Sequence, residues 1–105
     1  MKIEPKYEDV LESLDWRVVG KDLKTVDIEN WSPAGENIVI TLKTDDLPGS
    51  AMEEYENFDA DEHAEMWIEN RGKRGIPSSI RTLIDDADAI EGMLKELADR
   101  LAEVE

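Results

Sequence analysis

Apolar residues recur first at helical and then at strand-like spacing along the first third of the chain. In the segment KYEDVLESL (residues 6–14) they fall at i, i+3, i+4 and i+7, which is the spacing of one face of an amphipathic helix. Pro5 lies near the start of this segment, where a helix tolerates proline. The apolar positions are Tyr7, Val10, Leu11 and Leu14. The pattern predicts a short N-terminal helix.

Three strand-like segments follow this helix. DWRVVGKD predicts a short strand that ends at Gly20, and LKTVDIENW alternates with Val26 and Ile28 on one face. The turn residues SPAG then lead into ENIVITLKT, which alternates again. The inward positions of this last segment are Ile38, Ile40 and Leu42. We expect a three-stranded antiparallel meander with one apolar face that must be covered.

The remaining chain has helical periodicity. Residues 47–57 predict a loop that runs into a short helix, residues 60–70 a second helix, and residues 78–104 a long third helix. The order of one helix, three strands and three helices indicates an α+β fold with the helices packed on one sheet face. No linker or repeat divides the sequence, so residues 1–105 are expected to form a single domain.

The long C-terminal helix has the clearest pattern. Its apolar residues alternate between spacings of four and three, which is a heptad seam. The seam consists of Leu83, Ala87, Ile90, Leu94, Leu97, Leu101 and Val104. Ile80 and Ile84 widen the apolar face near the start, where we expect the helix to lie on the sheet. Two i, i+4 ion pairs are expected on the exposed side, from Glu91 to Lys95 and from Glu96 to Arg100.

The length of this helix raises the question of a second subunit. At 1.5 Å per residue it would span about 40 Å, whereas a compact domain of this size is roughly 33 Å across. Its last turns could therefore overhang and form a homodimer. The candidate dimer seam is Leu94, Leu97, Leu101 and Val104. The alternative is a helix that packs within one chain or bends at Gly92, since glycine costs about 1 kcal/mol in a helix interior.

Charge is the dominant feature of the composition. The chain has 27 Asp and Glu against 12 Lys and Arg, a net charge of −15. Nucleic acid and anionic membranes repel such a chain, so the complementary partner is a basic protein. The absence of cysteine excludes disulfides, thiol nucleophiles and thiolate metal sites. With no apolar run long enough for a membrane span and no signal-peptide pattern, a cytoplasmic location is expected.

Much of the negative charge lies in one tract. Between Asp45 and Glu69 there are ten acidic residues and no Lys or Arg. One interpretation is a solvated helix surface. The other is mimicry, in which carboxylates stand in for the phosphates of nucleic acid and occupy the groove of a basic enzyme. The candidate partner-binding residues are Asp45, Asp46, Glu53, Glu54, Glu56, Asp61, Glu62, Glu65 and Glu69.

The only histidine lies within this tract, in FDADEHAEMW. Asp59 followed by Glu62 resembles a capping box and predicts a helix start, with His63 packed on Phe58 as a staple. The core face of this helix is expected to be Ala60, Ala64, Trp67 and Ile68. The competing interpretation is metal-dependent hydrolysis at His63 and its neighbouring carboxylates. Because tryptophan occupies the position of a second histidine, capping and packing are favoured and no metal is expected.

A basic island follows the acidic tract. Its cations are Arg71, Lys73, Arg74 and Arg81. Local structure explains part of it, because Gly72 suits a helix end and Ser78 or Ser79 can cap the next helix. The functional alternative is a contact for an anion or a partner at the helix start. A third alternative is a salt bridge to the acidic tract.

Three stretches, WSPAGENIVITL, YENFDADEHAEMW and GIPSSIRTLIDDADAIEGMLKELADRL, together cover roughly residues 30–102. In these stretches the chain resembles a family of small acidic proteins encoded in phages and integrative mobile elements of gut Gram-positive bacteria. No catalytic residue carries over from this family. The resemblance implies a genomic setting in which small acidic proteins are often inhibitors of host defence, of the anti-CRISPR or antirestriction type.

The sequence thus predicts an acidic, non-enzymatic protein that inhibits a basic nucleic-acid-processing enzyme, such as a CRISPR effector, by imitating nucleic acid. No cofactor is expected. The location would be the cytoplasm, and for a phage-encoded protein the cytoplasm of the host cell. The alternative is a homodimeric structural or regulatory module that associates through the long helix, with acidity serving solubility.

Overall fold

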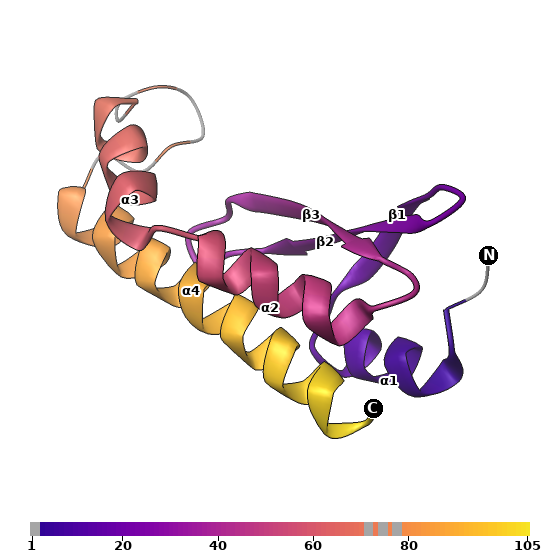
Figure 1. The fold of residues 1–105 in the computed structure, drawn as a ribbon. Helices are drawn as coiled ribbons and strands as arrows, with labels where there is room; N and C mark the ends of the chain where they lie inside the picture. The colour runs from indigo at the N-terminus through magenta and orange to yellow at the C-terminus, as the bar shows by residue number, and fades with distance from the viewer. Residues whose placement is uncertain (1–2, 71–72, 74–75, 77–78) are drawn as a thin grey trace.

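The computed structural model describes residues 3–70, 73, 76 and 79–105 and confirms the α+β fold (Figure 1). One helix, three strands and three further helices follow one another along the chain, as the periodicity predicts. Their bounds are α1 Pro5–Ser13, β1 Arg17–Lys21, β2 Thr25–Trp31, β3 Asn37–Lys43, α2 Leu47–Asn57, α3 Ala60–Glu69 and α4 Ile80–Glu103.

The three strands form an antiparallel sheet in the order β1-β2-β3. Val26 of β2 lies opposite Leu42 of β3, and both are buried, which confirms the predicted inward face. An irregularity in the pairing of β1 with β2 lies between Val18 and Gly20, and β1 runs on to Lys21, one residue beyond the predicted end. The alternation of apolar and polar residues therefore sets the register of the meander.

The loop predicted at the start of residues 47–57 is wrong, because α2 is helical from Leu47 onward. The side chain of Asp46 accepts a hydrogen bond from the backbone N–H of Gly49 at 3.0 Å and so caps the helix. Pro48 occupies the first turn, where its missing N–H costs nothing. The cap and the proline together start the helix earlier than the apolar pattern indicates.

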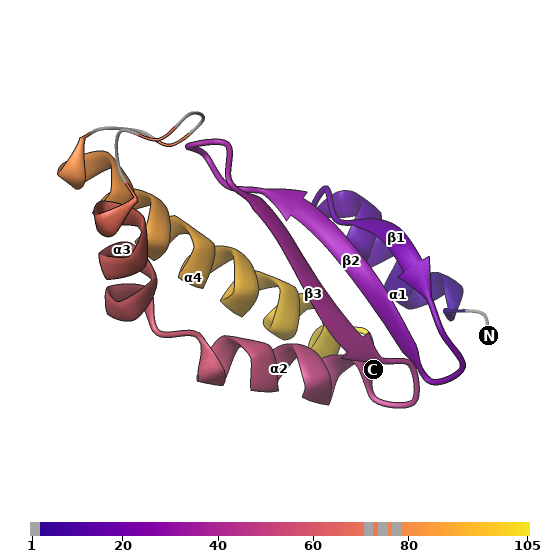
Figure 2. The same cartoon turned by 90° about the horizontal axis from the view of Figure 1, so that it is seen from above.

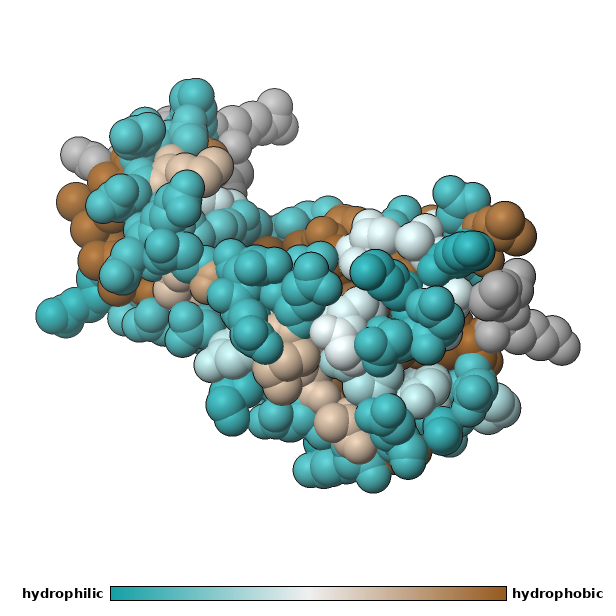
Figure 3. Space-filling model, in the orientation of Figure 1, coloured by the Kyte–Doolittle hydropathy of each residue, from teal (hydrophilic) through white to brown (hydrophobic). Residues whose placement is uncertain are grey.

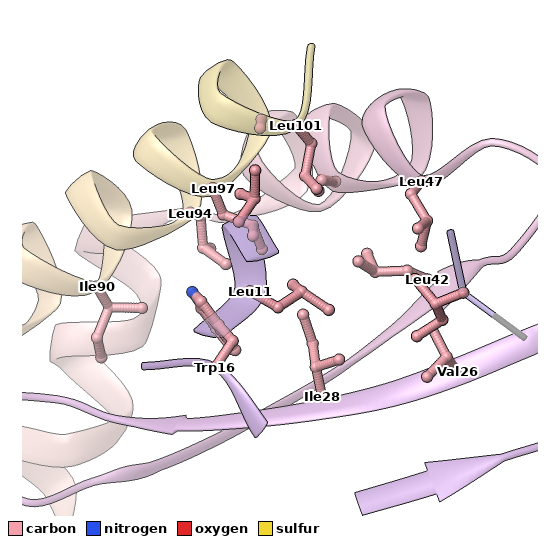
Figure 4. Packing of buried hydrophobic residues seen from close by; sticks show 14 residues of the cluster. Leu11, Trp16, Val26, Ile28, Leu42, Leu47, Ile90, Leu94, Leu97 and Leu101 are labelled. Carbon is pink, nitrogen blue, oxygen red and sulfur yellow. The ribbon is translucent and has the colours of Figure 1, made fainter. Parts of the chain in front are cut away.

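One face of the sheet and three helices enclose the hydrophobic core, which Figure 4 shows from close by. Val26, Ile28 and Leu42 of the sheet point toward Leu97 and Leu101 of α4. The core is completed by side chains from α1, α2 and the α1–β1 turn, namely Val10, Leu11, Trp16, Leu47 and Ala51. The helices thus bury the apolar sheet face, as the sequence predicts.

The predicted seam of α4 is confirmed as its buried face. Six of the seven positions are 3% exposed or less, and Val104 is half-buried against the core. The candidate dimer residues Leu94, Leu97 and Leu101 therefore lie inside the core of their own chain. A homodimer would need another surface, or these leucines would have to leave the core.

The predicted overhang of the last turns of α4 is wrong, because the molecule is elongated. Its longest axis is 41 Å, and the 24 residues of α4 span about 36 Å within it. The first turns of α4, not the last, extend past the end of the sheet, and α3 packs against them (Figures 1 and 2). Ile80 and Ile84 are consequently not on the sheet and are each 44% exposed.

The alternatives for Gly92 and for the ion pairs of α4 are also decided by the structure. The helix is continuous from Ile80 to Glu103, and Gly92 does not interrupt it. Lys95 pairs with Asp99 at 3.1 Å instead of Glu91. Arg100 pairs with Glu103 at 3.6 Å instead of Glu96, so both predicted pairs are wrong.

Within the described residues, no helix has the length and apolar composition needed to cross a bilayer.

Candidate functional site

The end of the sheet is fastened to α4 through a buried carboxylate. Asp86 is 5% exposed and accepts hydrogen bonds from the hydroxyl of Ser32 at 2.7 Å and from the backbone N–H of Ala34 at 2.8 Å. The hydroxyl of Ser32 in turn accepts from the backbone N–H of Glu36 at 2.9 Å. Gly35 completes the turn with φ +92°, a conformation that suits glycine. Asp86 therefore fixes the β2–β3 turn against α4.

The same turn is fastened to α3 through the only histidine. His63 Nε2 lies 2.7 Å from a carboxylate oxygen of Glu36. The imidazole ring also contacts Phe58, at a centroid distance of 5.2 Å, and Trp67, at 5.9 Å. The predicted staple between His63 and Phe58 is confirmed, and the contact with Glu36 explains why a polar ring occupies this position.

Partial burial governs the protonation of Glu36. Burial raises the pKa of its carboxyl above the ordinary glutamate value, and the nearby charge of Asp86 acts in the same direction. His63 and, to a smaller extent, Trp67 lower the pKa of this carboxyl and oppose part of the rise. Glu36 is therefore a half-buried carboxyl group held in place by its contact with His63 of α3.

A pocket of about 310 Å³ beside this pair offers limited chemistry. Its lining includes Glu36, His63 and Glu54, with Ile90 and Leu94 among its apolar residues. A carboxylate–imidazole pair can move protons, and no Ser, Thr or Cys is among the described lining residues to act as a hydroxyl or thiol nucleophile. Over the described part of the chain, no three His, Asp or Glu side chains are grouped to hold a metal ion. The geometry supports a tether between the sheet and α3.

The acidic tract bends sharply between α2 and α3. α2 ends at Asn57, and Asp59 begins α3 by accepting a hydrogen bond from the backbone N–H of Glu62 at 3.1 Å. The predicted cap is thus confirmed. Because the bend is short, the acidic end of α2 and the acidic first turn of α3 face each other across it.

A hollow of about 640 Å³ lies at this bend, and we call it the acidic hollow. Besides Asn57, Phe58 and Ala60, it is lined only by carboxylates, and no Lys or Arg is among its described lining residues. These carboxylates are Glu56, Asp59, Asp61, Glu62, Asp88 and Glu91. The first four come from the tract, whereas Asp88 and Glu91 come from α4. The structure therefore joins two stretches of sequence into one strongly negative concavity.

Among the described residues, no cation is paired with the carboxylates of the acidic hollow. None of the salt bridges formed among the described residues involves any of its six carboxylates. Lys95, which could have paired with Glu91 along α4, is bonded to Asp99. Asp59, Asp61 and Glu62 lie at the start of α3, where the helix dipole favours negative charge. Glu56, Asp88 and Glu91 have no comparable local explanation.

The other predicted acidic residues lie outside the hollow, so the tract is not one continuous face. Asp45 and Asp46 are at the opposite end of α2, where Asp46 serves as the helix cap. Glu53, Glu65 and Glu69 are exposed. Hydrophilic side chains nevertheless cover most of α2 and α3 on the face shown in Figure 3. The acidic hollow is therefore one part of a wider acidic surface.

Glu54 differs from the rest of the tract. It is half-buried beside β3 and lines the pocket that contains Glu36. Burial raises the pKa of its carboxyl, and the charge of the adjacent Glu53 raises it further. Glu54 therefore lies on the side of α2 that faces β3 and not on the exposed side.

The basic island is only partly within the described residues. Lys73 is exposed and donates a hydrogen bond to the side-chain oxygen of Asn70 at 2.8 Å, and Arg81 is exposed in the first turn of α4. Neither forms a salt bridge to a described residue of the tract. Ser79 caps α4 by accepting from the backbone N–H of Thr82 at 3.4 Å. The predicted Arg71, Gly72, Arg74 and Ser78 lie outside the described residues.

The predicted core face of α3 is only partly buried. Ala64 is 6% exposed, whereas Ala60, Trp67 and Ile68 are half-buried. The physical reason is that α3 packs on the part of α4 that extends past the sheet, so only one neighbouring helix covers it.

Sequence reasoning missed the two α4 residues of the acidic hollow and the tethers of the turn. Asp88 and Glu91 are three residues apart beside the buried seam, and this spacing is the signal that could have placed them on one side of the helix. No comparable local pattern in the sequence predicts the contacts that Glu36 makes with His63 and that Asp86 makes with Ser32 and Ala34.

Comparisons of the chain with protein-family models, with curated protein sequences and with solved structures find no match. The geometry and charge of the acidic hollow are therefore the basis on which a function can be assigned.

Proposed function

We propose that the protein is a non-enzymatic inhibitor that binds a basic nucleic-acid-processing enzyme through the acidic hollow. Six carboxylates from α2, α3 and α4 line one concavity, and no Lys or Arg is among its described lining residues. This observation carries the proposal. Carboxylates gathered in this way resemble the phosphates of a nucleic-acid backbone in charge. Enzymes that act on nucleic acid present Lys and Arg side chains to such phosphates.

The electrostatic logic favours association with a positive surface. Each carboxylate of the hollow would gain a favourable electrostatic interaction when a cation of the partner lies beside it. A strongly negative chain is also steered toward a basic cleft at long range. The net charge of −15 makes direct binding to nucleic acid unfavourable. The partner class that best satisfies both conditions is a nuclease whose nucleic-acid channel is basic. A CRISPR effector or a restriction enzyme is the specific candidate that follows from the sequence resemblance.

Binding rather than catalysis is the proposed mode of action. Glu36 and His63 join the sheet to α3 through their contact at 2.7 Å, and no Ser, Thr or Cys is among the described residues of their pocket. The acidic hollow, by contrast, is open and formed by exposed or half-exposed side chains. Inhibition by occupying a channel needs only such a surface.

The experiment is a cleavage assay across a panel of purified CRISPR effectors and restriction enzymes, at about 50 mM and about 200 mM salt. We expect inhibition of at least one nuclease, and weaker inhibition at the higher salt concentration, because salt screens contacts between exposed charges. The test variant carries Glu56→Lys, Asp61→Lys and Asp88→Lys, which reverse charges from all three helices of the hollow. It should lose inhibition by a factor of at least about 100, as expected for several lost charge contacts.

The matched control reverses three exposed acids of α1, through Glu8→Lys, Asp9→Lys and Glu12→Lys. It changes the net charge by the same amount at a site remote from the hollow (Figure 1). Equal losses in the two triple variants would mean that only net charge matters. That result, or inhibition of no nuclease in the panel, would overturn the proposal.

A further inference from the structure

An apolar groove of about 270 Å³ adjoins the acidic hollow on the other side of the first turns of α3. Its apolar lining is contributed by Ala60, Ala64 and Ile68 of α3 and by Ile84 of α4. The groove shares Ala60, Asp61 and Asp88 with the acidic hollow, so the two form one continuous surface. Hydrophobic side chains gather beside the hydrophilic surface of α3 in Figure 3, near the start of α4.

The rim of the groove is as acidic as the hollow. Asp61, Glu65 and Asp88 line it together with the apolar side chains, and no Lys or Arg is among its described lining residues. Ile84 is 44% exposed although it belongs to the face that packs on α3. An aliphatic side chain that remains accessible between carboxylates is suited to an apolar group that arrives with positive charge beside it.

We infer that the groove receives an apolar side chain of the partner from a segment that also carries Lys or Arg, that is, a basic amphipathic helix. The inference rests on the proposed function and specifies which part of a basic enzyme is recognised. On a helix, residues three or four apart are neighbours. One apolar anchor in the groove therefore places flanking cations beside Asp61 and Asp88 and toward the acidic hollow.

Charge complementarity selects this occupant over the others. A second copy of the chain would bring its own net charge of −15 against the acidic rim, which is repulsive. A surface that imitated phosphates alone would gain nothing from an aliphatic groove. The groove thus provides the specificity that carboxylates lack, because exposed charges attract many basic surfaces, whereas an apolar anchor must also fit.

The test uses two labelled peptides of about 15 residues, a length that covers several helical turns. One contains only Lys and Leu, with leucines at i, i+3, i+4 and i+7, and the other has alanine at every leucine position, so their charges are equal. Binding is measured by fluorescence anisotropy. We expect the Lys–Leu peptide to bind the wild-type protein roughly tenfold more tightly than the Lys–Ala peptide, through burial of one anchor side chain.

The variant Ile84→Ser should abolish most of this preference and leave the binding of the Lys–Ala peptide unchanged. Ala60→Leu, which fills the groove from α3, should have the same effect and serves as the second variant. Leu23→Ser is the matched control, since Leu23 is 74% exposed in the β1–β2 turn at the opposite end of the molecule (Figure 2). It should bind both peptides as the wild type does.

Equal affinity of the wild type for both peptides would overturn the inference. So would an Ile84→Ser variant that loses the same fraction of its affinity for each peptide. A dimer in sedimentation experiments that Ile84→Ser dissociates would also overturn it, by assigning the groove to a second copy.

The proposed function and this inference fail in different ways. If only the proposed function fails, the peptide preference persists and no nuclease is inhibited. If only this inference fails, nuclease inhibition persists in Ile84→Ser and the peptide preference is absent.

Discussion

The two halves of α4 are buried in different ways. In the sheet-covered half, residues 90–101, Leu94, Leu97 and Leu101 are at most 3% exposed beneath the sheet, α1 and α2. In the α3 corner, which comprises α3 and residues 80–88 of α4, Leu83 is 2% exposed but Ile84 is 44% exposed. One helix therefore supplies a closed core at one end and an accessible, acid-rimmed surface at the other.

This difference shows how a small domain divides stability and binding. The sheet-covered half contains the large buried side chains, so it supplies most of the hydrophobic free energy of folding. The α3 corner has fewer fully buried apolar side chains and carries an acidic rim that includes Asp61 and Asp88. An accessible acidic surface can persist in the corner because the rest of α4 is firmly packed.

The largest expected effect is the truncation of a leucine in the sheet-covered half. Leu97→Ala should lower the free energy of unfolding by about 3 kcal/mol, because it removes a fully buried side chain and leaves a cavity. Ile84→Ala in the α3 corner should cost less than about 1 kcal/mol, because its side chain is already partly in water. Urea unfolding measures both values. Similar costs for the two variants would refute the contrast between the halves.

The next effect concerns the carboxylate that joins the sheet to α4. Asp86→Ala should lower the free energy of unfolding by about 2 kcal/mol, because the N–H of Ala34 and the hydroxyl of Ser32 lose a charged acceptor. Asp85→Ala is the matched control at the adjacent exposed position and should change stability by less than about 0.5 kcal/mol. Equal effects of the two substitutions in urea unfolding would show that the tether contributes little.

A stabilising change is expected at Gly92 in the sheet-covered half. A Cβ atom at this position would meet no atom within 4 Å, and the helix is continuous there. Gly92→Ala should therefore raise the free energy of unfolding by about 0.5–1 kcal/mol, since alanine favours the helix. The measurement is again urea unfolding. A loss of stability would mean that α4 needs the conformational freedom of glycine at this point.

The smallest effect is a dependence of stability on pH at Glu54. Its pKa is raised in the folded state, so the contribution of Glu54 to stability is fully present below the unfolded-state pKa and is lost as pH rises through the folded-state pKa. Glu54→Gln should therefore raise the melting temperature at pH 7, and the gain should vanish as the pH falls below about 4. Glu12→Gln, at an exposed position of α1 outside the acidic hollow, is the control. A gain that persists at low pH would contradict this account.

Local periodicity was sufficient to predict the elements and the buried face of α4. The heptad spacing identified Leu83 through Leu101 correctly because one helix face needs only local sequence. The same spacing could not say which element covers each turn. Ile84 continues the apolar face, yet it lies beyond the sheet, because the position at which the strands end is set by the contact of the β2–β3 turn with Asp86.

The candidate site could be predicted only in part, for a similar reason. The acidic tract without Lys or Arg was evident from the sequence, and the predicted cap at Asp59 correctly placed the start of α3. The hollow also needs Asp88 and Glu91, which are far along the chain and reach it only through the packing of α3 on α4. The bond between Glu36 and His63 joins residues 27 positions apart, a pairing that no local pattern specifies.

The most direct test of the central claim, that the acidic hollow takes the place of nucleic acid, is a competition measurement. Labelled DNA bound to a nuclease that the panel identifies is titrated with the protein at about 50 mM salt. We expect the wild type and the α1 charge-reversal variant to displace the DNA, whereas the variant with Glu56→Lys, Asp61→Lys and Asp88→Lys should not. A ternary complex of nuclease, DNA and protein would contradict this claim.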